Sequence, residues 1–401
     1  MAESPIADIF RNSFNSYVNT HGGLTADHYK VAHAIMECRT EVMGGHVWCC
    51  PECHNEVTMY NSCRNRHCPR CQAYASAQWV QARIEELIPV KYFHVVFTIP
   101  QELNPFALRN KVPFYSIMFR AVSETIKELG ENPKFLGGST GFIAVLHTWG
   151  SNLMDHPHIH CIVPGGALSH DRTKWISARK NFLFAAPVMR KLFMGKLLAY
   201  FKSGIANKDI VFHGILQKYN EPKLLQDLFY TLYRKEWVVY AKSSFANPQA
   251  VIKYLGAYTH RIAISDKRIK EVDESADTVT FGVKDYTRKR RSILTLTSEE
   301  FIRRFLLHVV PTGFMRIRHF GFLSNRLQKT LLPVCKKLLG TEEETEEKKE
   351  EKPIHWYDII TKLTGKDPRI CPKCGMHQMI LIDKIYRKKR LIFNHGGISC
   401  G

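Results

Sequence analysis

The sequence lacks the features of a membrane or secreted protein. It has no uninterrupted apolar run of about 18 residues, the length that a membrane-spanning helix needs, so we expect no membrane span. The first residues, "MAESPIADIF", lack the charged-then-apolar layout of a secretion signal. No basic amphipathic helix with tryptophan or phenylalanine on its other face stands out. We therefore expect a cytoplasmic protein that does not bind membranes.

Two catalytic signatures are also missing. No G-x-x-x-x-G-K-[ST] stretch occurs, which argues against an attached nucleotide-driven motor. No H-E-x-x-H pattern occurs, which argues against a zinc hydrolase of that type. The sequence has no internal repeats of fixed period.

Acidic residues are scarce relative to basic ones. The chain of 401 residues has 37 Asp and Glu against 57 Lys and Arg, a formal net charge of +20. Such an excess attracts polyanions, and nucleic acid is the usual one. The length suffices for two or three domains.

Cysteines are almost absent from the long middle of the chain, because seven of the 12 lie between Cys38 and Cys71. In a cytoplasmic protein this density favours metal binding over disulfides. The "CPEC" and "CPRC" turns predict one structural zinc ion held by four thiolates: Cys50, Cys53, Cys68 and Cys71. Four interleaved residues could hold a second zinc ion or could be buried and surface residues without a metal: Cys38, His46, Cys63 and His67.

The stretch "CRNRHCPRC" also carries three arginines on this metal-binding loop: Arg64, Arg66 and Arg70. Rigidly held arginines suit contacts with phosphates or bases, so we predict that they bind DNA. The alternative is ordinary surface charge.

A second metal site is predicted at "MDHPHIHCIVPGG". Alternate residues of a strand face the same side, so His158 and His160 point together while Ile159 faces the core. His147, in the preceding strand-like run "FIAVLHTWG", would lie opposite this pair if the two runs form an antiparallel hairpin. Three histidines on one face predict a divalent-metal site.

A third motif, "VIKYLGAYTHRIAIS", places Tyr254 and Tyr258 one helical turn apart. Paired tyrosines at this spacing are often core residues, but Lys253 and Arg261 favour a phosphate nearby. A tyrosine hydroxyl is a competent nucleophile when a metal polarises the phosphate that it attacks. The two motifs together therefore suggest DNA strand breakage and rejoining through a tyrosine nucleophile.

The motifs of the chain resemble those of a known family. "HPHIHCIVPGG" is similar to the His-hydrophobic-His motif of the HUH endonucleases. Together with "CRNRHCPRCQ", "YFHVVFTIP", "VLHTWG", "YLGAYTHRIAIS" and "FLLHVVPTGFMRIRHFGFL", it resembles the IS91-family transposases, in the same motif order, from about residue 5 to about residue 330.

The resemblance implies an α+β fold, in which a small zinc-binding domain precedes a ferredoxin-like HUH domain with a central antiparallel sheet. It implies that His158 and His160 bind a catalytic Mg²⁺ or Mn²⁺, with His147 carried over less firmly. It also implies that Tyr254 and Tyr258 are the nucleophiles, with Tyr254 as the first candidate. The implied activity is rolling-circle-like transposition. Single-stranded DNA at the element's ends would be cleaved to a 5′-phosphotyrosine and a free 3′-OH, and the partners would be the single-stranded ends and the target DNA. One departure is Ala257, where an arginine would be expected.

Three alternatives remain open from the sequence. A plasmid replication initiator or relaxase would share the chemistry but often carries a motor. A non-catalytic, zinc-dependent DNA-binding protein derived from a transposase would have lost the cleavage chemistry. The intact histidine and tyrosine motifs argue against this alternative. A zinc hydrolase would need a general base near the histidines.

Composition suggests five regions. We expect a zinc-binding DNA-recognition domain (residues 1–76), a catalytic domain (77–270), a basic segment (271–335), a charged linker (336–353) and a tail (354–401). The basic segment supplies four predicted DNA contacts: Arg288, Lys289, Arg290 and Arg291. In the tail, Cys371 and Cys374 could form half of a zinc site, which His377, His395 or Cys400 could complete, or they could be cysteines without a metal.

Overall fold

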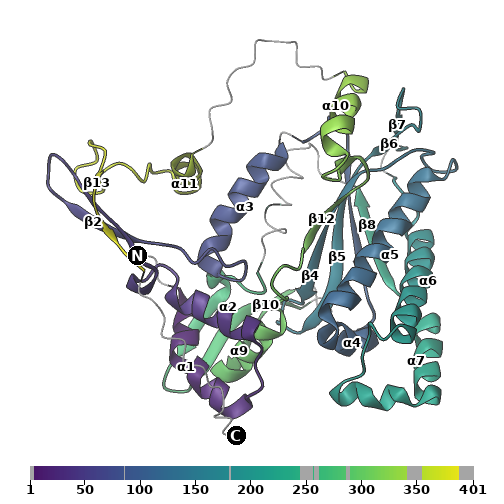
Figure 1. The fold of residues 1–401 in the computed structure, drawn as a ribbon, viewed down its shortest axis with the longest axis horizontal. Helices are drawn as coiled ribbons and strands as arrows, with labels where there is room; N and C mark the ends of the chain where they lie inside the picture. The colour runs from purple at the N-terminus through teal and green to yellow at the C-terminus, as the bar shows by residue number, and fades with distance from the viewer. Residues whose placement is uncertain are drawn as a thin grey trace, which may run out of the picture.

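A five-stranded antiparallel sheet forms the centre of the computed structural model (Figure 1). The structure describes residues 4–84, 86–179, 182–243, 256, 262–285, 290–340 and 355–387. The strand order is β12-β4-β5-β3-β8. The strands are β3 (Tyr92–Thr98), β4 (Phe142–Trp149), β5 (Asp155–Pro164), β8 (Val238–Ser243) and β12 (Ile317–Phe320). The expected α+β fold with a central antiparallel sheet is confirmed.

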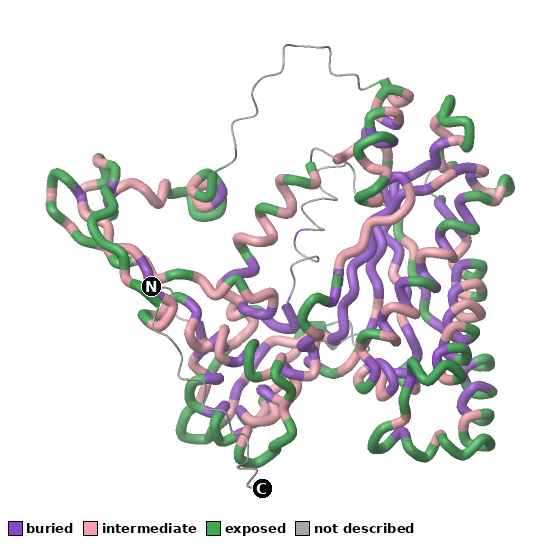
Figure 2. The backbone as a smooth tube through the Cα atoms, viewed as in Figure 1, coloured by how far each residue is buried: buried purple, intermediate pink, exposed green. Residues whose placement is uncertain are grey.

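One face of this sheet is fully packed. Alternate residues of β3, Phe93, Val95 and Phe97, are buried in the largest core together with Ile159 of β5. The helices that cover this face are α4 (Asn104–Arg109), α5 (Lys111–Glu131), α6 (Ala186–Ala206) and α7 (Pro222–Arg234). Helix α5 buries apolar residues at helical spacing, which explains why it lies along the sheet. The packed strands are mostly buried in Figure 2.

Among the described residues, a smaller core covers the opposite face near one end. There, Val145 and Ile162 pack against Phe322 and Leu331, which belong to η5 (Gly321–Leu323) and α10 (Gln328–Leu338). Further along the same strands the residues on this face are histidines. This face therefore carries an apolar core near one end and histidines near the other.

A smaller sheet lies beside that end, with strand order β11-β10-β9. Its strands are β9 (Ile269–Asp273), β10 (Thr278–Asp285) and β11 (Arg290–Thr297). Phe281 of β10 meets Phe301 with ring centroids 5.8 Å apart. The core behind this sheet is shared with α1 (Pro5–His21), α2 (Ala26–Glu37) and α9 (Ser298–Leu307).

A third sheet joins the two ends of the described chain. It has the order β13-β1-β2 and lies at the left of Figure 1. Its strands are β1 (Gly45–Cys49), β2 (Glu56–Tyr60) and β13 (Ile380–Ile385). Helix α11 (Trp356–Thr364) lies against α3 (Pro69–Ile84), where Lys362 Nζ donates to Gln81 Oε1 at 3.2 Å.

The remaining elements are short: β6 (Gly166–Leu168), β7 (Trp175–Ser177), η1 (Glu41–Met43), η2 (Gln101–Leu103), η3 (Gly214–Asn220) and η4 (Asp266–Arg268). Across the described ranges, no helix combines the length and the apolar character needed to cross a membrane. The five compositional regions stay a prediction, but packing crosses their limits. Strand β12, from 271–335, joins the central sheet, and β13, from the tail, joins the N-terminal hairpin.

Candidate metal centre and DNA-binding groove

Three histidines converge at the open end of the central sheet. Strands β4 and β5 form an antiparallel pair in which His147 lies opposite His158, and His160 follows on the same face. One ligand nitrogen from each of the three lies within 4.8 Å of the others. His147 and His160 are buried, and His158 is partly exposed. Asp155 and His156, at the start of β5, are not members of this cluster. The predicted convergence of the three histidines is therefore found in the structure.

Two of these rings are oriented through Nδ1. His158 Nδ1 lies 2.5 Å from the carbonyl oxygen of His156, to which it donates as Nδ1–H. His160 Nδ1 lies 2.8 Å from Nε2 of His94. Metal-binding histidines are commonly held in this way through the nitrogen that does not bind the metal. A divalent cation at this site would then be bound through Nε2 of both residues.

His94 is the residue that the sequence analysis missed. It lies on β3, and Val96, two residues further, pairs with His160 in the register of β3 and β5, so both face the histidine side. Burial, reinforced by the charge of Lys242, lowers the pKa of His94 to about 4. His94 is therefore neutral near pH 7. Its place in "YFHVVFTIP", with the histidine outside the Phe-Val-Phe core positions, is the signal that could have found it.

The cluster opens into a groove of about 800 Å³ between the central sheet and the β9–β11 sheet. His147, His158 and His160 line one side, together with Trp149. Four cationic residues with exposed positions line the other: Lys267, Lys270, Lys284 and Arg291. Lys284 and Arg291 are paired across β10 and β11. The groove thus places positive charge opposite the histidines, as a phosphate-binding site would.

The four predicted contacts of the basic segment have different outcomes. Arg291 lines the groove. Arg290 is exposed at the start of β11 and is not among the residues that line it. Arg288 and Lys289 lie outside the described residues. The roles of all four in DNA binding stay predictions.

The tyrosine motif also lies outside the described residues, which include neither Tyr254 nor Tyr258, nor Lys253 and Arg261. Gly256, midway between the two tyrosines, is described and buried. Ser76 Oγ, on α3, donates to the carbonyl oxygen of Gly256 at 2.5 Å. A Cβ atom added to Gly256 would lie 2.0 Å from Cγ2 of Val80. Only glycine allows this approach to α3.

The cysteines form two groups of four, and the predicted division between them is wrong. One group is Cys38, Cys63, Cys68 and Cys71, and the other is Cys50, Cys53, Cys371 and Cys374. His46 and His67 belong to neither group. The cause is the β1–β2 hairpin, whose tip carries Cys50 and Cys53. At about 3.3 Å per residue its five-residue strands hold the tip about 16 Å from the base, where Cys38 and Cys63 lie.

Each group has the dimensions of a tetrahedral thiolate site. A zinc ion about 2.3 Å from four sulfurs requires S–S separations of about 3.8 Å. Cys71 Sγ lies 3.6 Å from the Sγ atoms of both Cys38 and Cys63. In the other group the separations are 3.7 Å for Cys50 and Cys374, and 3.6 Å for Cys53 and Cys371. The donor sets therefore fit zinc.

Two of the three arginines near the first group contact protein. Arg66 Nη1 donates to the Phe314 carbonyl at 2.6 Å, and Arg70 Nη1 donates to the Cys38 carbonyl at 2.8 Å. Arg64 is exposed. These contacts give Arg66 and Arg70 a structural role, and DNA binding by the three stays a prediction.

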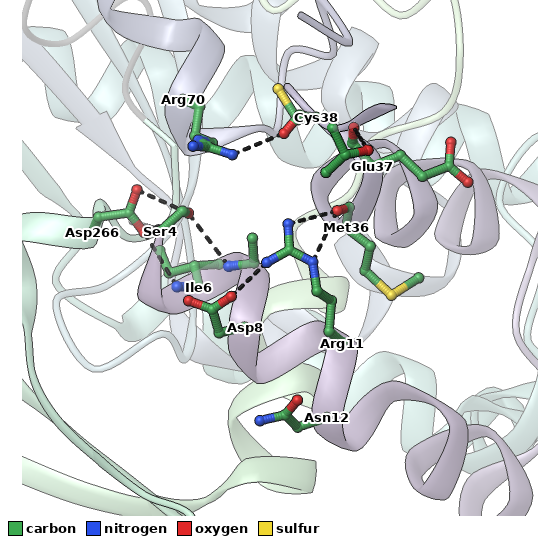
Figure 3. A network of polar contacts seen from close by, with 12 residues as sticks. Ser4, Ile6, Asp8, Arg11, Asn12, Met36, Glu37, Cys38, Arg70 and Asp266 are labelled. Atoms are coloured by element: carbon green, nitrogen blue, oxygen red, sulfur yellow. Dashed lines mark hydrogen bonds and ion pairs between the residues drawn. The ribbon is translucent and has the colours of Figure 1, made fainter. Parts of the chain in front are cut away.

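The N-terminal helix connects the first cysteine group to the groove wall (Figure 3). Arg11 donates to the Met36 carbonyl through Nε and Nη2, at 3.1 and 2.8 Å. Ser4 and the backbone N–H of Ile6 donate to the carboxylate of Asp266, which precedes Lys267 of the groove. The zinc-binding residues thus share one packed unit with the wall that faces the histidines.

Known proteins match most of this chain. The family described as "Transposase zinc-binding domain" matches residues 9–99, and the family described as "Putative transposase" matches residues 141–330. The "Putative transposase y4qJ" of Sinorhizobium fredii is 43% identical over 383 residues, 94% of each chain. The "Transposase for insertion sequence element IS801" of Pseudomonas savastanoi pv. phaseolicola is 24% identical over 382 residues, 92% of this chain and 88% of that one. No solved structure matches.

The zinc-binding match precedes the transposase match, and this is the order in which the cysteine and histidine motifs occur along the chain. The chain belongs to the IS91-family transposases, with an N-terminal zinc-binding domain.

Proposed function

We propose that this transposase cleaves and rejoins single-stranded DNA at the ends of its element through a tyrosine nucleophile. The observation that carries the proposal is the three-histidine cluster, which opens into a groove whose opposite wall is cationic. A histidine cluster alone would fit several metal enzymes. The facing cations supply the charge that a DNA backbone requires.

The groove favours a single strand over a duplex. Its wall combines Lys284 and Arg291 with Ile293, which is 68% exposed, while Trp149 lines the groove near the histidines. Cations that follow the backbone, together with apolar surface for unstacked bases, are typical of single-strand binding. We infer that the phosphate to be cleaved lies between the cations and the three histidines.

The histidines would hold one Mg²⁺ or Mn²⁺, which polarises the phosphate and stabilises charge on the leaving oxygen when it is bound. The hydroxyl of Tyr254 or Tyr258 loses its proton to water as its oxygen attacks phosphorus, the bond from phosphorus to O3′ breaks, and the 3′ oxygen takes up a proton from water. The products are a 5′-phosphotyrosine and a free 3′-OH. Attack of a 3′-OH on the phosphotyrosine reverses the step and rejoins the strands. With a second tyrosine, a second strand can be held in the same cycle.

The test is incubation of the purified protein with labelled single-stranded DNA from the element's ends, with Mg²⁺ or Mn²⁺. We expect a protein–DNA adduct that survives denaturation, and we expect its loss in Tyr254→Phe, in Tyr258→Phe or in the double variant. Loss in one single variant identifies the primary nucleophile. Loss only in the double variant shows that either tyrosine can act.

A matched control comes from the sheet itself. Tyr240 is 50% exposed on β8 and pairs in register with Val96, which pairs with His160, so it faces the histidine side. Tyr240→Phe should leave the adduct intact. An adduct that survives the double variant and disappears in Tyr240→Phe would overturn the assignment. Tight DNA binding without any adduct would instead favour a non-catalytic DNA-binding protein.

A further inference from the structure

We propose a second zinc site, split between the two ends of the chain, in which Cys371 and Cys374 complete the site begun by Cys50 and Cys53. The C-terminal segment 355–387 is then a part of the zinc-binding domain, although the match to that domain ends at residue 99. The proposal is independent of the tyrosine chemistry.

The two Cys-x-x-Cys turns have matching backbone geometry. In the first, the N–H of His54 donates to the carbonyl of Cys50 at 3.1 Å, and His54 has a φ of 53°. In the second, the N–H of Gly375 donates to the carbonyl of Cys371 at 2.9 Å, and Gly375 has a φ of 71°. Each turn thus directs two sulfurs to one point, and the two turns face each other across the 3.6 and 3.7 Å separations.

The strands behind these turns hold the two segments together. Strand β13 pairs antiparallel with β1, from Gly45 opposite Ile385 to Cys49 opposite Ile380. Gly44 makes this possible, because a Cβ atom there would lie 2.5 Å from the carbonyl oxygen of Ile385. The contact requires the backbone of the last strand to approach a residue without a side chain.

The apolar core of this module is too small to hold the sheet together alone. Its buried members in the described chain are Cys50, Cys371 and Met379, with Trp48 and Val57 partly buried against them. Ile380, Leu381 and Ile382 of β13 are all exposed by 42–52%. Small sheets of this kind usually depend on a metal for stability. Four thiolates at tetrahedral spacing supply the ligands.

The primary test is the zinc content of the purified, reduced full-length protein. We expect two zinc ions per chain, and one after the double substitution Cys371→Ser with Cys374→Ser. Cys50→Ser with Cys53→Ser should remove the same single ion. The matched control is Cys49→Ser, because Cys49 adjoins Cys50 but belongs to neither group; it should retain both ions. A zinc content that is unchanged by the Cys371 and Cys374 substitutions would overturn the proposal.

A second measurement does not depend on whether the variants fold. A protease site inserted between Glu346 and Glu347 allows the wild-type chain to be cut after purification. With zinc bound, the C-terminal fragment should stay with the rest of the protein during gel filtration, and a zinc chelator should release it. Retention of the fragment after the chelator has removed all zinc would show that the metal does not join the two ends, and would overturn the proposal.

Discussion

Nε2 of His94 lies 2.8 Å from Nδ1 of His160, with both rings buried and nearly parallel, at an interplanar angle of 8°. His94 is not a member of the three-histidine cluster. It contacts the ring of His160, which is a member, and holds that ring in the orientation that directs its Nε2 away from β3. The relationship makes His94 a positioning residue for the proposed metal site.

Replacing His94 should weaken the metal site without removing a ligand. Loss of such an outer partner typically lowers metal affinity or activity about 10–100-fold. We expect His94→Leu to shift the Mn²⁺ concentration needed for half-maximal adduct formation upward by that factor, with less effect at saturating Mn²⁺. His156→Ala is the matched control, because His158 is held by the backbone carbonyl of His156, which the substitution keeps. An equal shift in both variants would contradict the positioning role.

If the groove cations bind DNA, their replacement should change how the affinity for DNA depends on salt concentration. Each phosphate contact on a single strand contributes about 0.7 to the slope of log affinity against log salt concentration. Lys284→Ala with Arg291→Ala should therefore reduce the slope by about 1.4 and weaken binding of all sequences similarly. The measurement is fluorescence anisotropy with labelled single-stranded DNA over a range of NaCl concentrations.

Lys191→Ala is the control for this experiment. Lys191 is exposed on α6, one of the helices that cover the opposite face of the central sheet. Its replacement should leave the slope unchanged. A slope that falls equally in both variants would mean that the DNA does not lie in the groove.

The sequence predicts the histidine site well because the information is local. Period-two alternation and one short connection suffice to place His147 opposite His158 and His160. It does not predict the division of the cysteines, because that depends on a strand pairing between residues more than 300 positions apart. Four cysteines close in sequence look like one site until the hairpin separates them. His94 was missed for a similar reason, since its partner His160 lies on another strand.

The contact of Gly256 with α3 gives a packing test of the tyrosine segment. Gly256→Ala would place Cβ 2.0 Å from Cγ2 of Val80, and overpacking of this kind costs about 1–3 kcal/mol. We expect slower adduct formation in Gly256→Ala, by a factor on the order of 10. The double variant Gly256→Ala with Val80→Ala provides the space and should recover most of the rate. If Val80→Ala gives no recovery, the contact with α3 does not position the segment between the tyrosines.

His308 should contribute to the acid sensitivity of the fold. It is fully buried, with Nε2 3.0 Å from the Leu153 carbonyl and Nδ1 3.2 Å from Thr148 Oγ1. Burial lowers its pKa from the usual 6.5 to about 4, and the charge of Lys111 adds to the effect. Between these values the unfolded chain binds a proton that the folded chain does not. The contribution of His308 to the free energy of unfolding is therefore fully present above pH 6.5 and is lost as the pH falls toward 4.

When the pH is lowered from 7.5 to 5, His308 should reduce the free energy of unfolding by about 2 kcal/mol. His308→Gln retains a donor for the Leu153 carbonyl and cannot be protonated in this range. The variant should therefore lose less stability than the wild type between the two pH values, whatever its stability at pH 7.5. Thermal unfolding of both proteins at each pH measures the difference. Other histidines whose pKa is lowered by partial burial, such as His28 and His319, affect both proteins equally. An identical loss of melting temperature in the two proteins would mean that His308 is protonated in the folded state, and that its bonds to Leu153 and Thr148 do not require the neutral ring.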